Sequence, residues 1–393
     1  METVRDRQMA HKVRRSQSLA SLTLTQSTSL SLSPPQIDRL SLLPNELLDH
    51  IFDLAYSIDT PSTGALSKHL LPFHITGIYR RISLTKPDNI IRLIETVNRA
   101  LPLGEAIQEL HLNPYGTTPD SFDTFEEEKL REFYRRSNRL ERLSLGRATS
   151  LLTGTLMTSD PTLKPLSFPC LLHLHFDMSY VEYTHNPLFD FSSFPILQDL
   201  RIADWHIDDG TLPTSSLTHL PHLSALTING ANADDLSIAS FCSLCPVLTH
   251  LTLECYLANY GDLLKQLPPT LTHLKLLKEP DAPGPGQHCD HELHRFNLVE
   301  ELSLDDGLYS PSLPLYLVGF NSLRILRLGK GHFSIEEMSK LLSGPTRLES
   351  LLRIEFNNDL YSFDPNSLEV VKTELSEEGW FALSLREPDG LDE

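Results

Sequence analysis

The sequence reads Leu248-Thr249-His250-Leu251-Thr252-Leu253 and, 23 residues further on, Leu271-Thr272-His273-Leu274-Lys275-Leu276. Both stretches fit the pattern Leu-x-x-Leu-x-Leu. In this pattern the last two leucines alternate as on a β-strand, and the first covers the turn that leads into the strand. The pattern therefore predicts a strand with one apolar and one polar face, repeated along the chain.

The same pattern recurs along most of the sequence, and its starts lie 23 to 33 residues apart. The starts are Tyr79, Ile107, Leu140, Leu171, Leu197, Leu223, Leu248, Leu271, Val299, Leu323 and, more weakly, Leu348. Leucine-rich repeats are about 20–29 residues long, and longer intervals indicate inserted loops. The segments between the strands include helical patterns at residues 89–100, 125–135, 234–244 and 334–342. We therefore expect an α/β leucine-rich-repeat solenoid, with parallel strands on a concave face and helices on a convex face.

The rest of the chain flanks this array, which we assign to residues 79–386. Residues 1–39 are rich in serine and predict a disordered tail. Residues 40–78 predict a small helical segment, and the acidic end 387–393 is expected to be loose. Residues 381–385 predict a closing strand.

The helical segment begins with a clear amphipathic pattern at residues 43–55. Pro44 suits a first helical turn, because its missing N–H would have no partner there. Leu47, Leu48, Ile51 and Phe52 fall at the spacing of one apolar face. A second short helix is expected at residues 64–71, before Pro72.

Composition and charge narrow the functional classes. The formal net charge is −19, whereas binding to nucleic-acid phosphates needs clustered lysines and arginines, so we expect no nucleic-acid partner. The five cysteines form an odd set without a disulfide-like spacing, which predicts a reducing compartment, the cytoplasm or the nucleus. No run of about eighteen apolar residues occurs, so we expect no membrane association.

Three clusters of reactive side chains predict neither catalysis nor metal binding. Cys242 and Cys245 have the spacing of a zinc or redox pair, but they lie where one repeat passes into the next, which favours buried packing. Residues 288–294 mix histidines with cysteine and acids in a proline-containing insertion, which favours a solvated loop. The glutamates at 126–128 point in different directions around a helix. We expect a protein that is not an enzyme, with no catalytic residues, metal or cofactor.

We expect the partner-binding surface on the concave face. Side chains between the apolar positions of each strand alternate toward that face. They are His111, Ser144, His175, Arg201, Thr227, Thr252, Lys275, Ser303 and Arg327. These groups suit protein recognition, but any strand-based solenoid needs polar residues here, so the pattern gives a location and no partner.

The opening of the helical segment resembles a known motif. Leu43-Pro44-Asn45-Glu46-Leu47-Leu48, continued by Ile51 and Phe52, resembles the start of the F-box. Cys245-Pro246-Val247-Leu248 is similar to the repeat junctions of F-box proteins that carry leucine-rich repeats. The second half of an F-box has a basic, tryptophan-containing stretch, whereas here residues 78–82 run directly into the repeats.

The resemblance implies a substrate adaptor of an SCF-type ubiquitin ligase. In that family the F-box docks on the Skp adaptor protein, which bridges to cullin and RING subunits, and the repeats hold the protein to be ubiquitinated. The Skp-binding residues implied here are Leu43, Pro44, Glu46, Leu47, Leu48, Ile51 and Phe52. An alternative stays open, in which the N-terminal helices only cap the solenoid and the chain is a non-catalytic scaffold or inhibitor.

Overall fold

The computed structural model divides into two compact units, Met1–Leu48 and Asp49–Glu393. It describes residues 44–45, 47–48, 51, 70–113, 126–146, 155–156, 166–177, 191–203, 220–231, 235–255, 260–278, 289–305, 308–329, 335–343, 347–357, 371–375 and 380–385. In the first unit, the N–H groups of Leu47 and Leu48 donate to the Pro44 carbonyl, so a helical turn begins where proline was expected to open one. Leu43, Glu46 and Phe52 lie outside the described residues.

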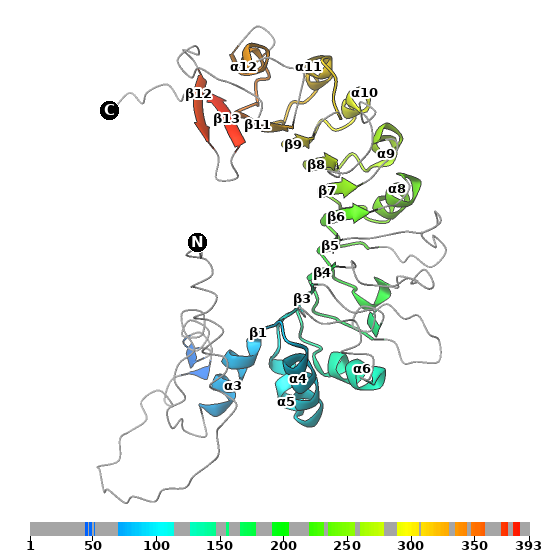
Figure 1. Cartoon of the computed structure of the whole chain (residues 1–393), viewed down its shortest axis with the longest axis vertical. Coiled ribbons are helices and arrows are strands. Elements are labelled where there is room, and N and C mark those ends of the chain that lie inside the picture. The colour runs from blue at the N-terminus through cyan, green and yellow to red at the C-terminus, as the bar shows by residue number, and fades with distance from the viewer. Residues whose placement is uncertain are drawn as a thin grey trace, which may run out of the picture. The chain divides into compact units, whose positions relative to one another are not determined.

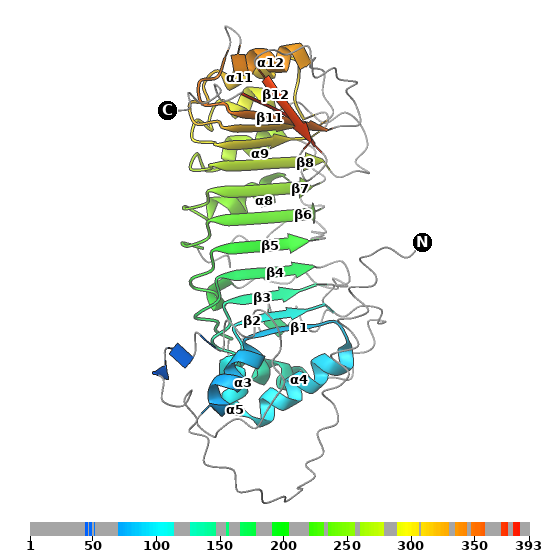
Figure 2. The ribbon, with the colours of Figure 1, turned by 90° about the vertical axis from the view of Figure 1, so that its left-hand side faces the viewer.

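The second unit contains a single open sheet in which eleven consecutive strands run parallel (Figure 2). The strands are β1 (Arg81–Leu84), β2 (Glu109–Leu112), β3 (Arg142–Leu145), β4 (His173–Asp177), β5 (Asp199–Ala203), β6 (Ala225–Ala231), β7 (His250–Cys255), β8 (His273–Lys278), β9 (Glu301–Leu304), β10 (Ile325–Leu328) and β11 (Arg353–Asn357). Each strand pairs with the next one in the sequence. This α/β architecture is compatible with a repeat solenoid, because every repeat contacts only its neighbours.

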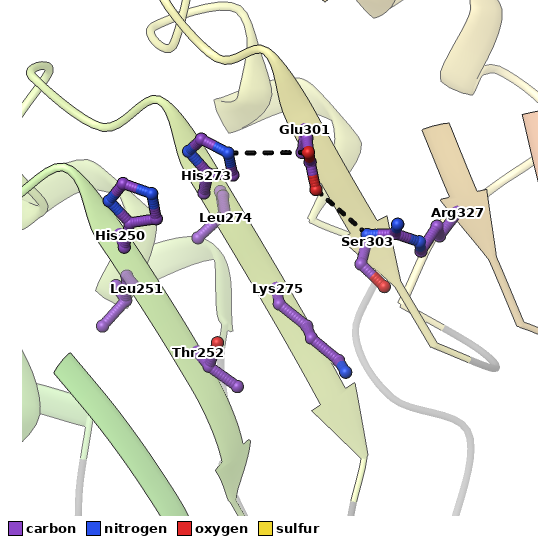
Figure 3. Close-up of a pocket in the computed structure, with 9 residues that line it drawn as sticks. All are labelled: His250, Leu251, Thr252, His273, Leu274, Lys275, Glu301, Ser303 and Arg327. Carbon is purple, nitrogen blue, oxygen red and sulfur yellow. Dashed lines mark hydrogen bonds and ion pairs between the residues drawn. The ribbon is translucent and has the colours of Figure 1, made fainter. Parts of the chain in front are cut away.

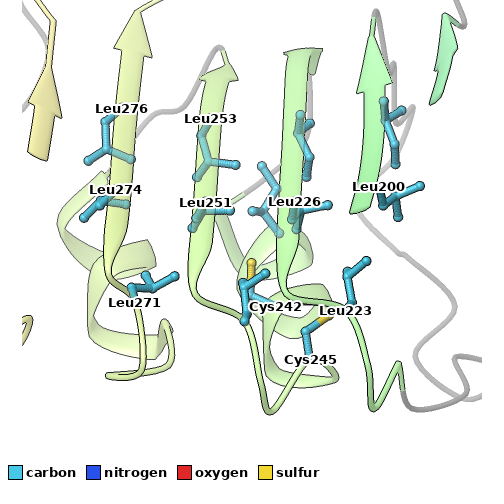
Figure 4. Close-up of a cluster of buried hydrophobic side chains, with 14 of the residues drawn as sticks. Leu200, Leu223, Leu226, Cys242, Cys245, Leu251, Leu253, Leu271, Leu274 and Leu276 are labelled. Atoms are coloured by element: carbon cyan, nitrogen blue, oxygen red, sulfur yellow. The ribbon is translucent and has the colours of Figure 1, made fainter. Parts of the chain in front are cut away.

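The apolar residues of the repeated pattern form continuous buried rows across the sheet. Leu251 of β7 pairs in register with Leu226 of β6 and with Leu274 of β8, and each is 1% exposed. The next apolar position behaves in the same way, so Leu253 lies between Ile228 and Leu276. Figure 4 shows these leucines projecting from neighbouring strands toward one layer. A slip of one residue would expose a whole row, so the alternation fixes the register.

Helices lie on the other side of this apolar layer (Figure 1). They are α3 (Leu71–Arg80), α4 (Pro87–Arg99), α5 (Leu101–Ala106), α6 (Glu127–Arg136), α8 (Asp235–Ser243), α9 (Tyr260–Gln266), α10 (Asp290–Leu293), α11 (Leu313–Leu317) and α12 (Ile335–Ser343). Helix α4 shows why these segments are helical. Proline occupies its first turn, and Ile90, Leu93, Ile94 and Val97 recur at helical spacing and are buried.

Aromatic rings fill the same layer around β4 and β5. Tyr134 of α6 contacts Phe168 edge-on at 5.8 Å between ring centroids, and Phe168 stacks on Phe194 at 5.4 Å. Phe191, in the 3-10 helix η4 (Phe191–Ser193), contacts Phe241 of α8 at 5.6 Å. These ring contacts form part of the hydrophobic core between α6 and α8. They stabilise it because a buried aromatic ring removes a large apolar area from water.

Strand direction reverses at the end of the sheet. Strand β13 (Trp380–Leu385) runs antiparallel to β11, and β12 (Val371–Leu375) runs antiparallel to β13. The closing strand predicted at residues 381–385 is therefore present, and β12 is an additional strand beyond it.

Several local expectations differ from the structure. Most of the helix predicted at residues 64–71 lies outside the described residues. At its expected end, α3 begins at Leu71, because Pro72 serves as a first-turn residue instead of a terminator. Residues 289–294 are not a fully solvated loop, since Cys289, Asp290 and Leu293 are buried and α10 begins there. Helices α5, α9, α10 and α11 were not predicted. None of the described helices is long and apolar enough to cross a membrane.

Candidate functional site

The sheet register places the nine polar residues predicted for the strand face in one cross-strand row. His111 pairs with Ser144, Ser144 with His175, and the row continues strand by strand to Arg327. His111, Arg201 and Lys275 are exposed, and Ser303 is 4% exposed. The other five, Ser144, His175, Thr227, Thr252 and Arg327, are half-buried.

A second polar row lies on the same face, two residues earlier in each strand. It includes Glu109, Arg142, His173, Asp199, His250, His273, Glu301 and Arg353, and it is interrupted by Ala225 on β6 and Ile325 on β10. The sequence analysis did not predict this row. Side chains on a strand alternate between its two faces, so the residue two positions before each member of the first row lies on the same face. The repeated Leu-Thr-His-Leu of β7 and β8 was the available signal.

Around β3 and β4 the strand face carries a hydroxyl–imidazole contact. Ser144 Oγ lies 3.2 Å from His175 Nδ1. Burial lowers the pKa of His175, and the cation of Arg201 lowers it further. His175 is therefore a neutral imidazole near pH 7, held in place by its neighbour.

On β5, Asp199 is contacted by the side chains of Arg201 and His173. Arg201 donates to both of its oxygens, from Nε at 3.4 Å and from Nη2 at 3.2 Å. His173 Nδ1 lies 3.5 Å from Asp199 Oδ2. These contacts orient side chains that face solvent, and Arg201 remains 60% exposed.

A pocket of about 170 Å³ opens on the strand face between β7 and β10 (Figure 3). Its lining is His250, Leu251, Thr252, His273, Leu274, Lys275, Glu301, Ser303 and Arg327. The imidazoles of His250 and His273 stack with ring centroids 4.0 Å apart and planes 12° apart. Burial lowers the pKa of His250, and a positive charge on His273 lowers it further.

An ion-pair chain forms one wall of this pocket. Figure 3 shows Glu301 between His273 and Arg327, with its Oε1 3.6 Å from His273 Nε2 and its Oε2 accepting from Arg327 Nη1 at 3.1 Å. Arg327 Nε also donates to Glu355 Oε2 at 2.6 Å, and Arg353 Nε lies 2.7 Å from Glu355 Oε1. The charges alternate in sign from β9 to β11, so each charge is next to its opposite.

Neither protein-family models nor curated proteins match the sequence.

The cysteine pair predicted to pack in the core does so. Cys242 and Cys245 are both 0% exposed, and the Cys245 thiol donates to the Phe241 carbonyl at 3.5 Å. Figure 4 shows both cysteines beside the leucines of the repeat core. Burial raises the pKa of Cys245 to about 12, so its thiol stays protonated and unreactive at neutral pH.

The polar insertion before β9 is hydrogen-bonded to the segment that follows β9. Its described side chains do not form a metal site. The Cys289 thiol donates to the Leu308 carbonyl at 3.1 Å, and Asp290 Oδ2 accepts from the Ser310 N–H at 2.8 Å. His291 is 55% exposed, and no group of three potential metal ligands occurs among the residues whose positions are described.

The described strand face presents charged and hydrogen-bonding side chains in two rows, an arrangement that suits recognition. A serine nucleophile needs a base, a group that orients the base, and donors for the oxyanion. Ser144 lies in β3, which pairs with β2 on one side and with β4 on the other. The backbone N–H groups next to Ser144 are therefore part of the sheet pairing and are not offered to an oxyanion. In the described part of the face, the polar groups lie along rows and come together in the pocket between β7 and β10.

Proposed function

We propose that this chain is the substrate-recognition adaptor of an SCF-type ubiquitin ligase, in which leucine-rich repeats hold the protein to be ubiquitinated. The observation that carries the proposal is the strand face, where two rows of mainly polar residues run across most of the eleven parallel strands. The proposal assigns no covalent chemistry to the chain itself.

The dimensions of this face suit a protein partner. Neighbouring strands lie about 4.8 Å apart, so eleven strands extend over roughly 48 Å. A specific protein interface covers about 800 Å² on each partner. The mixture of exposed Arg201 and Lys275 with half-buried His175 and Thr252 offers charges and hydrogen-bond donors over that length.

Docking to the Skp adaptor protein rests on the resemblance of residues 43–52 to the F-box. Leu47 is 50% exposed and Ile51 is 40% exposed, although both are large apolar side chains. Burying such a side chain contributes about 1.5–3 kcal/mol before association costs, so a few of them support a stable complex. Through Skp, the cullin and RING subunits would be the further partners.

One observation favours the alternative of a repeat scaffold whose N-terminal segment does not dock on Skp. Leu48, which the resemblance assigns to the Skp contact, is 0% exposed. A capping helix buries its apolar side chains and offers no docking surface. The two functions therefore differ in whether the apolar residues of this helix are available to a second protein.

A direct binding experiment separates the two functions. Purified full-length chain is mixed with purified Skp protein, and the affinity is measured by calorimetry for wild type and for the variant Leu47→Asp, Phe52→Asp. We expect binding by the wild type and a loss of at least about 100-fold in the variant, because two apolar contacts of roughly 1.5–3 kcal/mol are replaced by charges. Leu315→Asp, at a leucine that is 76% exposed on α11, is the matched control and should bind normally.

The outcome is decisive only if all three proteins are folded, which their thermal unfolding curves establish. Absence of binding by folded wild type overturns the adaptor function and leaves the scaffold. A wild-type affinity that the double substitution does not change places the contact elsewhere on the chain and removes the F-box assignment.

A further inference from the structure

We propose that the pocket formed by His250, Lys275 and Ser303 binds the carboxylate of an aspartate or glutamate side chain on the partner protein. This inference rests on the partner-binding role proposed for the strand face, and it names the chemistry that the face recognises.

The pocket is locally cationic although the chain as a whole has a net charge of −19. Its charged lining consists of Lys275, Arg327 and Glu301, which leaves a net charge of +1 when the histidines are neutral. Arg327 is already bonded to Glu301 and to Glu355. Lys275 is exposed and forms no ion pair with any residue in the described part of the chain. The uncompensated charge is therefore that of Lys275.

Two hydroxyl groups flank this lysine in the cross-strand row. Thr252 precedes Lys275 on the neighbouring strand β7, and Ser303 follows it on β9. All three residues line the pocket, and neighbouring strands are about 4.8 Å apart. A carboxylate has two oxygens with several lone pairs, so an ammonium group between two hydroxyl donors matches it.

The adjacent histidines are held in a defined tautomer. The Thr249 hydroxyl donates to the Ser224 carbonyl at 3.1 Å, so at its 2.9 Å contact with His250 Nδ1 it must accept a proton from the ring. Thr272 repeats this arrangement, donating to the Thr249 carbonyl and lying 2.9 Å from His273 Nδ1. A neutral His250 ring therefore carries its proton on Nδ1 and leaves Nε2 as an acceptor, whereas Nε2 of His273 lies 3.6 Å from the Glu301 carboxylate.

This tautomer links anion binding to proton uptake. An unprotonated Nε2 repels a carboxylate, whereas a protonated one donates to it. The charged groups that act on His250 are His273 of β8, Glu301 of β9, Asp199 of β5 and Glu300 before β9, while its β6 neighbour is the uncharged Ala225. A bound carboxylate adds a negative charge to this set, so it should raise the pKa of His250.

The same pocket disfavours a phosphate. A dianion would leave this lining, which already contains the negative charge of Glu301, with a net charge of −1. With neutral histidines, the net charge of +1 is balanced by a single carboxylate. We therefore assign the pocket to an acidic side chain and not to a phosphorylated one.

The test uses the full-length chain labelled with ¹³C in its histidines. The His250 and His273 signals are assigned with the variants His250→Asn and His273→Asn. Sodium acetate is then titrated at constant ionic strength, with sodium phosphate in a parallel series. We expect saturable shifts of both signals with acetate, a dissociation constant on the order of 10–100 mM, and an upward shift of the His250 pKa.

Lys275→Met should abolish the saturable response, whereas Lys340→Met, at an exposed lysine of α12, should retain it. Three results overturn the proposal: no saturable response of the wild type, an unchanged response in folded Lys275→Met, or saturation by phosphate at lower concentration than by acetate. Because no ligase component is present, these results are independent of whether the chain binds Skp.

Discussion

Arg327 Nε donates to Glu355 Oε2 at 2.6 Å, and this bond joins β10 to β11. The Glu355 side chain is only 8% exposed, and that of Arg327 is 29% exposed. Arg327 also bonds to Glu301, and Glu355 also pairs with Arg353. Loss of either residue therefore leaves a poorly solvated charge with fewer partners than it needs.

We expect Arg327→Met to lower the free energy of unfolding by about 1–3 kcal/mol. In a double-mutant cycle with Glu355→Gln, measured by urea unfolding, the coupling energy should be about 1 kcal/mol or more. The control cycle uses Lys265 and Asp262, whose side chains are 51% and 52% exposed and should couple by less than about 0.5 kcal/mol. Equal coupling in the two cycles would contradict a structural role for the ion-pair chain.

The buried leucine rows should dominate stability. Leu251 is 1% exposed between Leu226 and Leu274, so Leu251→Ala should cost about 2–5 kcal/mol through lost apolar burial and a residual cavity. Leu315→Ala removes the same atoms at a position that is 76% exposed and should change stability by less than about 0.5 kcal/mol. Similar losses in both variants, measured by chemical unfolding, are incompatible with the packing described.

Acid should destabilise the strand face through His175. Burial lowers the pKa of His175 in the folded chain, so the unfolded chain binds more protons once the pH falls below about 6.5. The stability that neutral His175 contributes is complete above that pH and is lost as the pH decreases. The melting temperature should therefore fall between pH 7.5 and 5.5, and less steeply in His175→Gln. His222→Gln, at an exposed position, is the control for the substitution itself.

The buried cysteines should resist alkylation. Burial raises the pKa of both Cys245 and Cys289 to about 12, so at pH 8 roughly one thiol in ten thousand is a thiolate. Iodoacetamide should modify them at least about 100-fold more slowly than the half-buried Cys170 in the folded chain, and at similar rates in urea. Peptide mass spectrometry gives the rates. Fast reaction of Cys245 in the folded chain would show that it is not the core residue described.

The order of the strands and the side that each strand buries could be predicted from the sequence. In an alternating pattern with one buried face, a slip of one residue would move the apolar side chains to the exposed face. Leu248-Thr249-His250-Leu251 gave the strand, its buried side and the face carrying Thr252. The α9 and α11 helices were not accessible, since segments of seven and five residues hold too few turns for a helical period to emerge. Strand β12 lies where the repeated pattern has ended, so no template located it.

The pocket was only partly accessible. Lys275 and Arg327 were placed on the strand face, but the stacking of His250 on His273 depends on side-chain conformations in two repeats. The bond of Arg327 to Glu301 likewise joins residues that are distant in sequence, and one sequence gives no sign of which acid an arginine selects. Side-chain contacts between neighbouring repeats could therefore be identified only from the structure.

The reversal of strand direction after β11 limits how the array can grow. A parallel edge is a template onto which a further copy of the chain could add its own first strand and continue indefinitely. Here β13 lies against β11 in the opposite sense and β12 follows it, so the next position no longer offers the parallel pairing that relates every earlier repeat to its neighbour. The antiparallel pair β13 and β12 therefore occupies the edge at which a head-to-tail continuation of the parallel array would have to begin.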